Sequence, residues 1–278
     1  NQPWKSLSPY IGCERSSTFE PRLTPPWPDI LITSGRKSVA AARYIKKQSN
    51  GKTYSVHIQD PKASYDAFDL IAVPQHDDAR GKNIIVTDGA PNKITADKIS
   101  AARSEFNFSK YGEPRIAVLI GGKSKAYDMS AQDTENLAQK LSALKGSLLI
   151  TCSRRTGAEN RRILERHLNP PNIFFWNGEG KNPYFGFLAW ADYILVTADS
   201  ASMISESCTT GKPVYMIPMQ GGARRIQSFQ NHHNKAKVLG VEDINLKLDL
   251  KNLVLGLKNF LVYFYYLIVY HPLILVPQ

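Results

Sequence analysis

Cysteine is scarce in this chain of 278 residues. The three cysteines, Cys13, Cys152 and Cys208, are scattered along it and odd in number. A disulfide framework needs paired cysteines, and a structural zinc site needs several ligands at short spacing. The sequence therefore predicts unpaired thiols in a reducing compartment and no metal site. We expect a cytoplasmic protein, with attachment to a membrane surface left open.

Several motifs of nucleotide chemistry are also missing. The run from Gly121 to Ser124, GGKS, resembles the end of a P-loop, but the required first glycine is replaced by Ala117. None of the 13 tyrosines has a lysine four residues later, and no glycine-rich dinucleotide fingerprint follows a strand. These absences argue against an NAD-dependent epimerase. No Asp-x-Asp pair is present to hold a metal beside a diphosphate, so we expect neither a metal nor a cofactor.

Positive charge is abundant instead. The formal net charge is +11, and the isoelectric point is near 9.5. Such a balance favours an anionic partner: a nucleotide, a nucleic acid or an anionic membrane. No aromatic-rich basic stripe or zinc-finger spacing supports nucleic acid, so we expect no nucleic-acid partner. A hydrophobic fraction of 42% and a charged fraction of 21% are typical of a globular protein.

Short apolar runs that end in polar loops alternate with amphipathic stretches along most of the chain. This alternation predicts an α/β protein with parallel sheets, arranged as two Rossmann-like lobes. We divide the chain into an irregular Pro-rich arm at 1–28, a first lobe at 29–110, a second lobe at 111–240 and an apolar tail at 241–278.

The tail is unusual in composition. Its strongly apolar stretch runs from Leu253 to Val276, long enough to cross a bilayer, which takes about 20 residues. Lys258 and His271-Pro272 interrupt it, and the uninterrupted core is too short. A buried or interfacial segment is the favoured interpretation, with a true membrane span and a misread end of the sequence as the alternatives.

The most informative segment runs from Tyr193 to Pro213. It predicts a buried strand, a polar turn at Asp199 and Ser200, and a helix closed by Gly211. Ligands of α/β proteins bind at such turns, and a helix N-terminus favours phosphate. Glu206 follows Ser202 by one turn, which places a carboxylate where it could accept hydrogen bonds from sugar hydroxyls. The alternative is that Asp199 or Ser200 only caps the helix and that Glu206 is solvated.

Most other candidate residues lie at the ends of other predicted strands. Gly121, Gly122, Lys123 and Ser124 predict anion contact, or else a tight turn. Ser153, Arg154, Arg155 and Thr156 suit a diphosphate, or else form a solvated basic loop. Asn182 and Tyr184 could recognise a base or form a hinge, or Pro183 could simply begin a helix. In the first lobe Asp60, His76 and Asp77 are candidate general bases, although each could be an ordinary turn residue.

Several of these motifs recur in order in one known family. They are PPWPDILITSGRKSVAAARYIKK, HIQDPKASYDAFDLIAVPQHD, IAVLIGGKSKAY, LLITCSRRTG and ADYILVTADSASMISESCTTGKPVYMIPM. The chain resembles, over about residues 25–230, bacterial proteins related to the plant mitochondrial-fission factor called elongated mitochondria. Bacterial members are often labelled nucleoside-diphosphate-sugar epimerases.

The resemblance implies a GT-B glycosyltransferase-like fold whose second lobe holds a nucleotide sugar. It implies that Glu206 binds the ribose and that Gly121–Ser124 and Ser153–Thr156 flank the base and phosphates. Asp199, Ser200, Ser202 and Met203 complete the predicted site. Family members carry a further N-terminal βα unit, so the first lobe is expected to be truncated, and residues after about His233 do not match the family's usual ending.

The favoured function is binding of a nucleotide-activated sugar, with metal-independent glycosyl transfer to an unknown acceptor that is lipid-linked or membrane-bound. The alternative is a non-catalytic GT-B-scaffold adaptor in membrane division or remodelling, so whether the chain is an enzyme stays open. An NAD-dependent nucleotide-sugar epimerase is the least favoured of the three. The sequence does not specify the donor or the oligomeric state.

Overall fold

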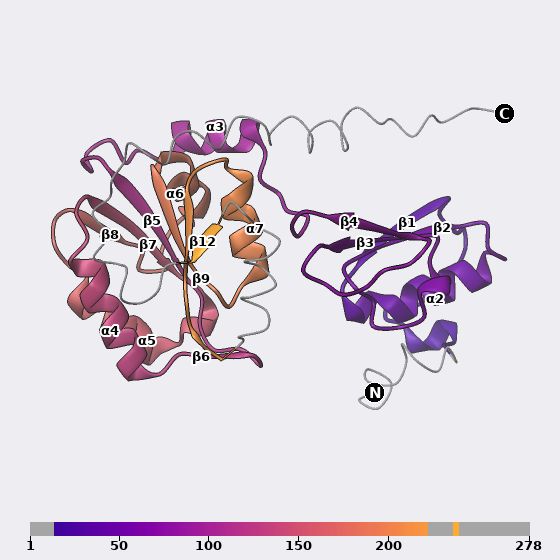
Figure 1. Ribbon diagram of the computed structural model, residues 1–278. Coiled ribbons are helices and arrows are strands. Elements are labelled where there is room, and N and C mark those ends of the chain that lie inside the picture. Colours follow the sequence, from indigo (N-terminus) through magenta and orange to yellow (C-terminus); the bar gives the residue numbers. More distant parts are fainter. Residues whose placement is uncertain (1–13, 222–235, 239–278) are drawn as a thin grey trace. The chain divides into compact units, whose positions relative to one another are not determined.

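The computed structural model describes residues 14–221 and 236–238 and divides into two compact units (Figure 1). The first unit ends at Pro91 and the second begins at Asn92. The whole apolar tail predicted at 241–278 and the start of the arm predicted at 1–28 lie outside the described residues. Among the described residues, no helix has the length and apolar character needed to cross a bilayer.

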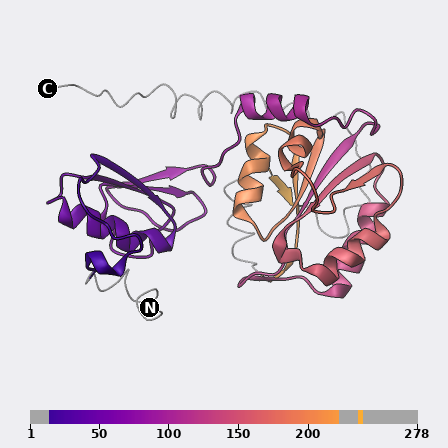
Figure 2. The ribbon, with the colours of Figure 1, turned by 180° about the vertical axis from the view of Figure 1, so that it is seen from behind.

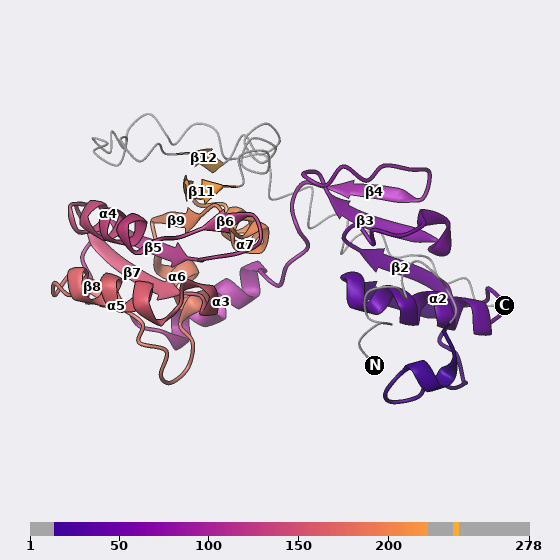
Figure 3. The same ribbon diagram turned by 90° about the horizontal axis from the view of Figure 1, so that it is seen from below.

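The first unit is a four-stranded parallel sheet with strand order β1-β2-β3-β4. Its strands are β1 at Ile30–Ser34, β2 at Tyr54–Ile58, β3 at Leu70–Pro74 and β4 at Ile84–Thr87. Helix α2 spans Val39–Gln48, and single 3-10 turns occupy Ser16–Thr18, Arg36–Ser38 and Tyr65–Ala67. Figure 3 shows α2 lying against one face of this sheet.

The two faces of this sheet differ sharply. On the face beneath α2, Val39 and Ala42 of the helix pack with Phe68, Ile71 and Val73. His57 lies on the same face, fully buried, with its Nδ1 2.9 Å from Thr33 Oγ1. Burial lowers the pKa of His57, so the imidazole is neutral in the folded protein.

The opposite face leaves large apolar side chains in solvent. Ile30 is 52% exposed and Ile32 66%, and Tyr54 and Ile85 are also exposed. The strand register places Ile30 opposite Tyr54 and Ala72 opposite Ile85, so these side chains share one face. Parallel sheets usually bury both faces, and this one buries a single face within the described residues.

We expect Ile32→Ala to change the free energy of unfolding by less than about 1 kcal/mol, because an exposed side chain leaves no cavity. The matched change Ile71→Ala should cost about 2–5 kcal/mol, because Ile71 is fully buried. Urea unfolding of the full chain measures both. Equal losses would show that the face bearing Ile32 is covered in the folded protein.

The second unit is a six-stranded parallel sheet with order β12-β10-β9-β5-β7-β8. The strands are β5 at Arg115–Ile120, β7 at Ser147–Cys152, β8 at Ile173–Phe175, β9 at Tyr193–Thr197, β10 at Val214–Ile217 and β12 at Ala236–Val238. The helices are α3 at Ala96–Glu105, α4 at Ala131–Ser142, α5 at Ala158–His167, α6 at Tyr184–Trp190 and α7 at Ala201–Thr209. A separate antiparallel pair joins β6 at Tyr127–Asp128 to β11 at Gln220–Gly221.

Helices cover both faces of this sheet, as Figures 1 and 2 show from opposite sides. Successive residues of β5 point into different cores: Leu119 packs with Phe187 of α6 and Ile204 of α7, whereas Val118 packs with Leu141 of α4 and Leu164 of α5. All six residues of β5 are buried. This burial explains why residues 116–120 of the strand are all apolar.

Helix α3 belongs to the second unit, although the sequence assigned residues up to 110 to the first. Arg103 Nη1 donates to Ala189 O at 3.0 Å, and Trp190 Nε1 donates to Phe106 O at 2.5 Å. The boundary therefore lies earlier than predicted. The physical reason is that α3 has a single buried residue, Ala102, so its own sequence does not indicate which core it packs against.

The strand order of the second unit creates a switch point beside β5. From β5 the chain builds outward through β7 to β8, then returns to build β9, β10 and β12 on the other side. The loops after β5 and β9 therefore diverge to opposite faces of the sheet. Ligands of open α/β sheets bind at such points, at the carboxyl ends of the strands.

Candidate nucleotide site in the second unit

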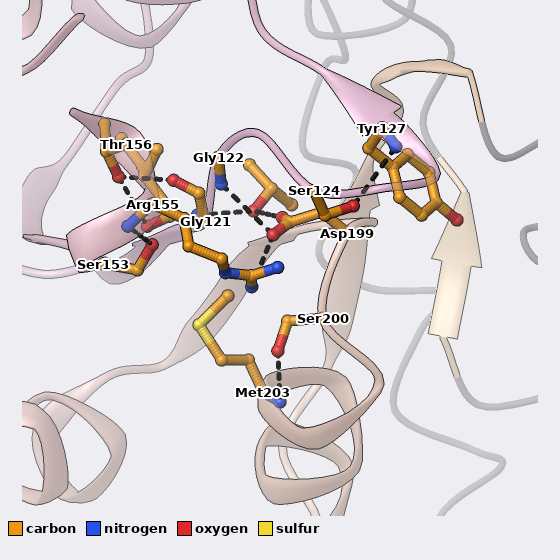
Figure 4. A network of polar contacts seen from close by, with 12 residues as sticks. Gly121, Gly122, Ser124, Tyr127, Ser153, Arg155, Thr156, Asp199, Ser200 and Met203 are labelled. Atoms are coloured by element: carbon orange, nitrogen blue, oxygen red, sulfur yellow. Dashed lines mark hydrogen bonds and ion pairs between the residues drawn. The ribbon is translucent and has the colours of Figure 1, made fainter. Parts of the chain in front are cut away.

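Three loops meet at the carboxyl edge of the second sheet (Figure 4). They follow the adjacent strands β5, β7 and β9 and carry most of the residues that the sequence singles out: Gly121, Gly122, Lys123, Ser124, Ser153, Arg154, Arg155, Thr156, Asp199 and Ser200. The strand order β9-β5-β7 brings these loops together. Their contacts, however, assign them unequal roles.

Asp199 is the centre of this loop cluster. Its carboxylate is fully buried and accepts hydrogen bonds from Thr197 Oγ1 at 2.6 Å and from the amide of Gly122 at 3.1 Å. Arg155 Nη2 lies 2.7 Å from its Oδ2. Asp199 is thus an internal anion that ties the three loops together. Thr197, which sequence reasoning missed, also accepts the amide of Gly121 at 2.7 Å, and its only sequence signal is a polar residue that ends an apolar strand.

The two adjacent arginines differ in what they contact. Arg155 pairs with Asp199 and keeps 40% of its side chain exposed, and Ser153 Oγ accepts its amide at 3.1 Å. Arg154 is exposed and has no polar partner within the described residues. Arg154 is therefore the free guanidinium of this loop, whereas Arg155 is held in place.

The glycine loop after β5 does not offer its backbone to a ligand. A Cβ on Gly121 would lie 2.0 Å from Asp199 Oδ1, and one on Gly122 would lie 2.2 Å from Arg155 O. The amides of Gly121 to Ser124 all donate within the chain, to Thr197, Asp199, Arg155 and Tyr127. The anion that this loop contacts within the protein is Asp199, and contact with a bound anion stays a prediction. The glycines are needed because the neighbouring loops approach this closely.

The remaining residues of these two loops mainly support the fold. Ser124 Oγ accepts the amides of Ala126 and Tyr127, both at 3.2 Å. Thr156 is buried, and its hydroxyl donates to the carbonyls of Ile120 and Gly121. Lys123 is exposed and pairs with Asp128 at 3.2 Å, so its ammonium can reach a ligand only by leaving that surface pair.

Helix α7 begins as the sequence predicts. Ser200 is its N-cap and accepts the amide of Met203 at 3.3 Å, whereas Asp199 is not the cap. Within the described part of the chain, the amides of Ala201 and Ser202 have no acceptor. Two free N–H groups at a helix N-terminus, together with the helix dipole, favour an anion.

Glu206 lies one turn further along α7 and is half-buried rather than simply solvated. Its Oε2 accepts a hydrogen bond of 2.6 Å from the Tyr184 hydroxyl. Burial, followed by the adjacent Glu206, raises the pKa of Tyr184, so the phenol stays protonated. Asn182 is exposed, and its Oδ1 accepts the amide of Tyr184 at 3.0 Å.

The first-unit candidates lie beyond the ends of their strands. Asp60 follows β2 and pairs with Lys62 at 2.6 Å, while His76 and Asp77 follow β3. The amide of Asp77 donates to Pro74 O at 2.9 Å. A role for these residues as general bases stays a prediction. Among the described residues, no three metal-ligating side chains gather at one place.

Two Rossmann-like units with parallel sheets define a protein of GT-B type. Solved structures share this fold: the glycotransferase of kitacinnamycin has a TM-score of 0.52 at 14% identity, covering 82% of this chain and 67% of that one. The UDP-GlcNAc 2-epimerase of Methanocaldococcus jannaschii has a TM-score of 0.51 at 13% identity, covering 82% and 70%. Identities this low show the fold alone.

The chain belongs to the family described as Mitochondrial fission ELM1, whose model matches residues 1–242. Mitochondrial fission protein ELM1 of Arabidopsis thaliana is 31% identical over 252 residues, covering 78% of this chain and 59% of the plant protein. The uncharacterized protein RP120 of Rickettsia prowazekii (strain Madrid E) is 30% identical over 234 residues, covering 68% and 64%. The family resemblance of the sequence motifs is confirmed, and the chain spans less than two thirds of the length of either relative.

Proposed function

We propose that the second unit binds a nucleoside diphosphate sugar and that the protein transfers the glycosyl group to an acceptor. The observation that carries the proposal is the N-terminus of α7 at the switch point, with two free amides and Glu206 one turn beyond them. The amides suit the diphosphate, and the carboxylate suits the ribose hydroxyls. The solved structure of UDP-GlcNAc 2-epimerase from Neisseria meningitidis, a GT-B-type neighbour, is described as bound to UDP-GlcNAc.

In the proposed reaction the bond between the sugar's anomeric carbon and the diphosphate breaks, and a bond from an acceptor oxygen forms. The acceptor's proton passes to a base, for which Asp60, His76 and Asp77 remain the candidates. The diphosphate gains negative charge as it leaves. In this scheme the Arg154 guanidinium, which has no partner among the described residues, and the α7 amides stabilise that charge without a metal.

The second candidate function is a non-catalytic adaptor on the same scaffold, related to membrane division or remodelling. One observation favours it: Arg155 and the four amides of residues 121–124, all predicted to contact the ligand, are engaged within the protein. An adaptor needs the scaffold that these contacts stabilise and does not need a vacant phosphate site.

Thermal unfolding of the full chain with the diphosphates of uridine, guanosine, cytidine and adenosine separates the two functions. One of them should stabilise the folded protein by about 2.7 kcal/mol at a hundredfold excess over Kd, and the melting temperature should rise as a result. Glu206→Gln should abolish most of that shift, because the amide loses the charge that accepts ribose hydroxyls. Glu20→Gln, at an exposed position of the first unit, is the matched control and should leave the ligand-induced shift in melting temperature unchanged.

The absence of any shift with folded protein would overturn nucleotide-sugar binding and favour the adaptor. Where a shift is seen, release of the free nucleoside diphosphate from its sugar conjugate tests transfer. If the protein binds the nucleotide sugar but releases no free nucleoside diphosphate when the sugar conjugate is in large excess, it is a nucleotide-responsive scaffold rather than an enzyme.

A further inference from the structure

The hydrogen bond between Tyr184 and Glu206 joins two separate elements of the second unit. Tyr184 begins α6, Glu206 lies in the middle of α7, and the two oxygens are 2.6 Å apart. Burial and the adjacent Glu206 raise the pKa of Tyr184, so the phenol stays protonated and donates this hydrogen bond at neutral pH. The direction of this hydrogen bond is therefore constant throughout the neutral pH range.

This contact restricts what Glu206 can do. The terminal torsion of a glutamate is broad, so an unheld carboxylate would sample many orientations. With Oε2 held by Tyr184, the carboxylate samples fewer orientations, and Oε1, which has no partner among the described residues, can accept from a ligand. A preoriented acceptor binds with less loss of rotamer entropy than a mobile one.

Tyr184 is itself held at its backbone and its ring. Its amide donates to Asn182 Oδ1 at 3.0 Å, and its ring lies edge-on to Phe185 with centroids 5.9 Å apart. Pro183, which precedes it, is buried. The position of the 178–183 loop therefore affects the position of Tyr184 and, through its hydroxyl, the orientation of the Glu206 carboxylate.

About one helical turn separates Glu206 from Ser202 near the N-terminus of α7, and four residues of α-helix rise about 6 Å along the axis. This is the order of the separation between the phosphates of a nucleotide and the hydroxyls of its ribose. We propose that Tyr184 is a positioning residue, which aims Glu206 at the ribose so that the site selects ribonucleotides over deoxyribonucleotides. The inference rests on the proposed nucleotide site and adds the origin of its sugar specificity.

The test is the ratio of the Kd values for a 2′-deoxyribonucleoside diphosphate and its ribo counterpart, measured by calorimetry on the full chain. The pair is uridine diphosphate and 2′-deoxyuridine diphosphate, or the matching pair for whichever base gives the thermal shift. The wild type should prefer the ribo form by about tenfold, the value of one charge-assisted hydrogen bond. Both Tyr184→Phe and Glu206→Gln should bring the ratio close to one.

Tyr193→Phe is the matched control, because it removes a hydroxyl from the amino end of β9, away from the carboxyl-edge loops, and should keep the wild-type ratio. A purely structural tyrosine would weaken both ligands equally and leave the ratio unchanged in Tyr184→Phe, which would overturn the inference while the nucleotide site stands. A wild-type ratio near one would also overturn it. If no nucleoside diphosphate binds the wild type, the proposed function fails first, and the inference fails with it.

Discussion

Arg155→Met is expected to lower the free energy of unfolding by about 2–4 kcal/mol, whereas Arg154→Met should change it by less than about 0.5 kcal/mol. The two side chains are neighbours in sequence and identical in chemistry. The difference between the two losses of stability therefore measures the effect of the contact between Arg155 and Asp199. Arg155 is the cationic partner of Asp199, whose carboxylate is fully buried. Removing the Arg155 guanidinium leaves the buried Asp199 carboxylate with two neutral donors, Thr197 Oγ1 and the Gly122 amide. Because Arg155 is partly exposed, the loss of stability should be smaller than for a fully buried ion pair.

Urea unfolding at neutral pH measures these free energies. The double variant Arg155→Met with Asp199→Asn provides the decisive comparison, because it removes the orphaned charge as well. We expect it to be more stable than Arg155→Met alone, since the pair is coupled. If Arg155→Met and Arg154→Met are equally stable, the ion pair does not form in the folded protein.

Gly122→Ala is expected to cost at least about 3 kcal/mol or to prevent folding, because close-packed backbone must move to admit the methyl group. The added carbon would lie 2.2 Å from Arg155 O and 2.4 Å from Thr156 N, both of them main-chain atoms. It would also separate the loops after β5 and β7, whose contact includes the bond from the Lys123 amide to Arg155 O at 3.2 Å.

Gly112→Ala is the control for this change. Gly112 is exposed, and a Cβ there meets nothing within 4 Å, so the variant should unfold like the wild type. Circular dichroism and urea unfolding of the two variants give the comparison. A stable Gly122→Ala protein would mean that the loops are further apart than described, and that the amides of residues 121–124 are available to a ligand after all.

Much of this architecture can be predicted from local pattern. Apolar residues fill strand β5 from Ile116 to Ile120, and the alternation of strands and helices indicated parallel sheets. Each polar loop follows a strand, so its place at the carboxyl edge follows from the parallel arrangement. Ser200 at the start of α7 has the side chain that an N-cap requires.

Other features depend on partners far away in the sequence. The same Gly-Gly pair suits a bound phosphate or an internal carboxylate, and only the fold brings Gly122 to Asp199, 77 residues further on. Arg154 and Arg155 are equivalent in sequence, and the direction of each side chain decides which one remains free for a ligand. The boundary after Pro91 depends on where α3 packs, and a helix with one buried residue carries little information about that.

The sequence by itself determined the α/β class with parallel sheets and the family, because those depend on periodicity and on motifs within short windows. The tertiary structure alone decided the pairing of Arg155 with Asp199, the hydrogen bond from Tyr184 to Glu206 and the exposure of one face of the first sheet. These depend on distances between residues that are remote along the chain. Hydrogen bonds and ion pairs act over a few ångströms in space, so their partners are defined only once the chain has folded.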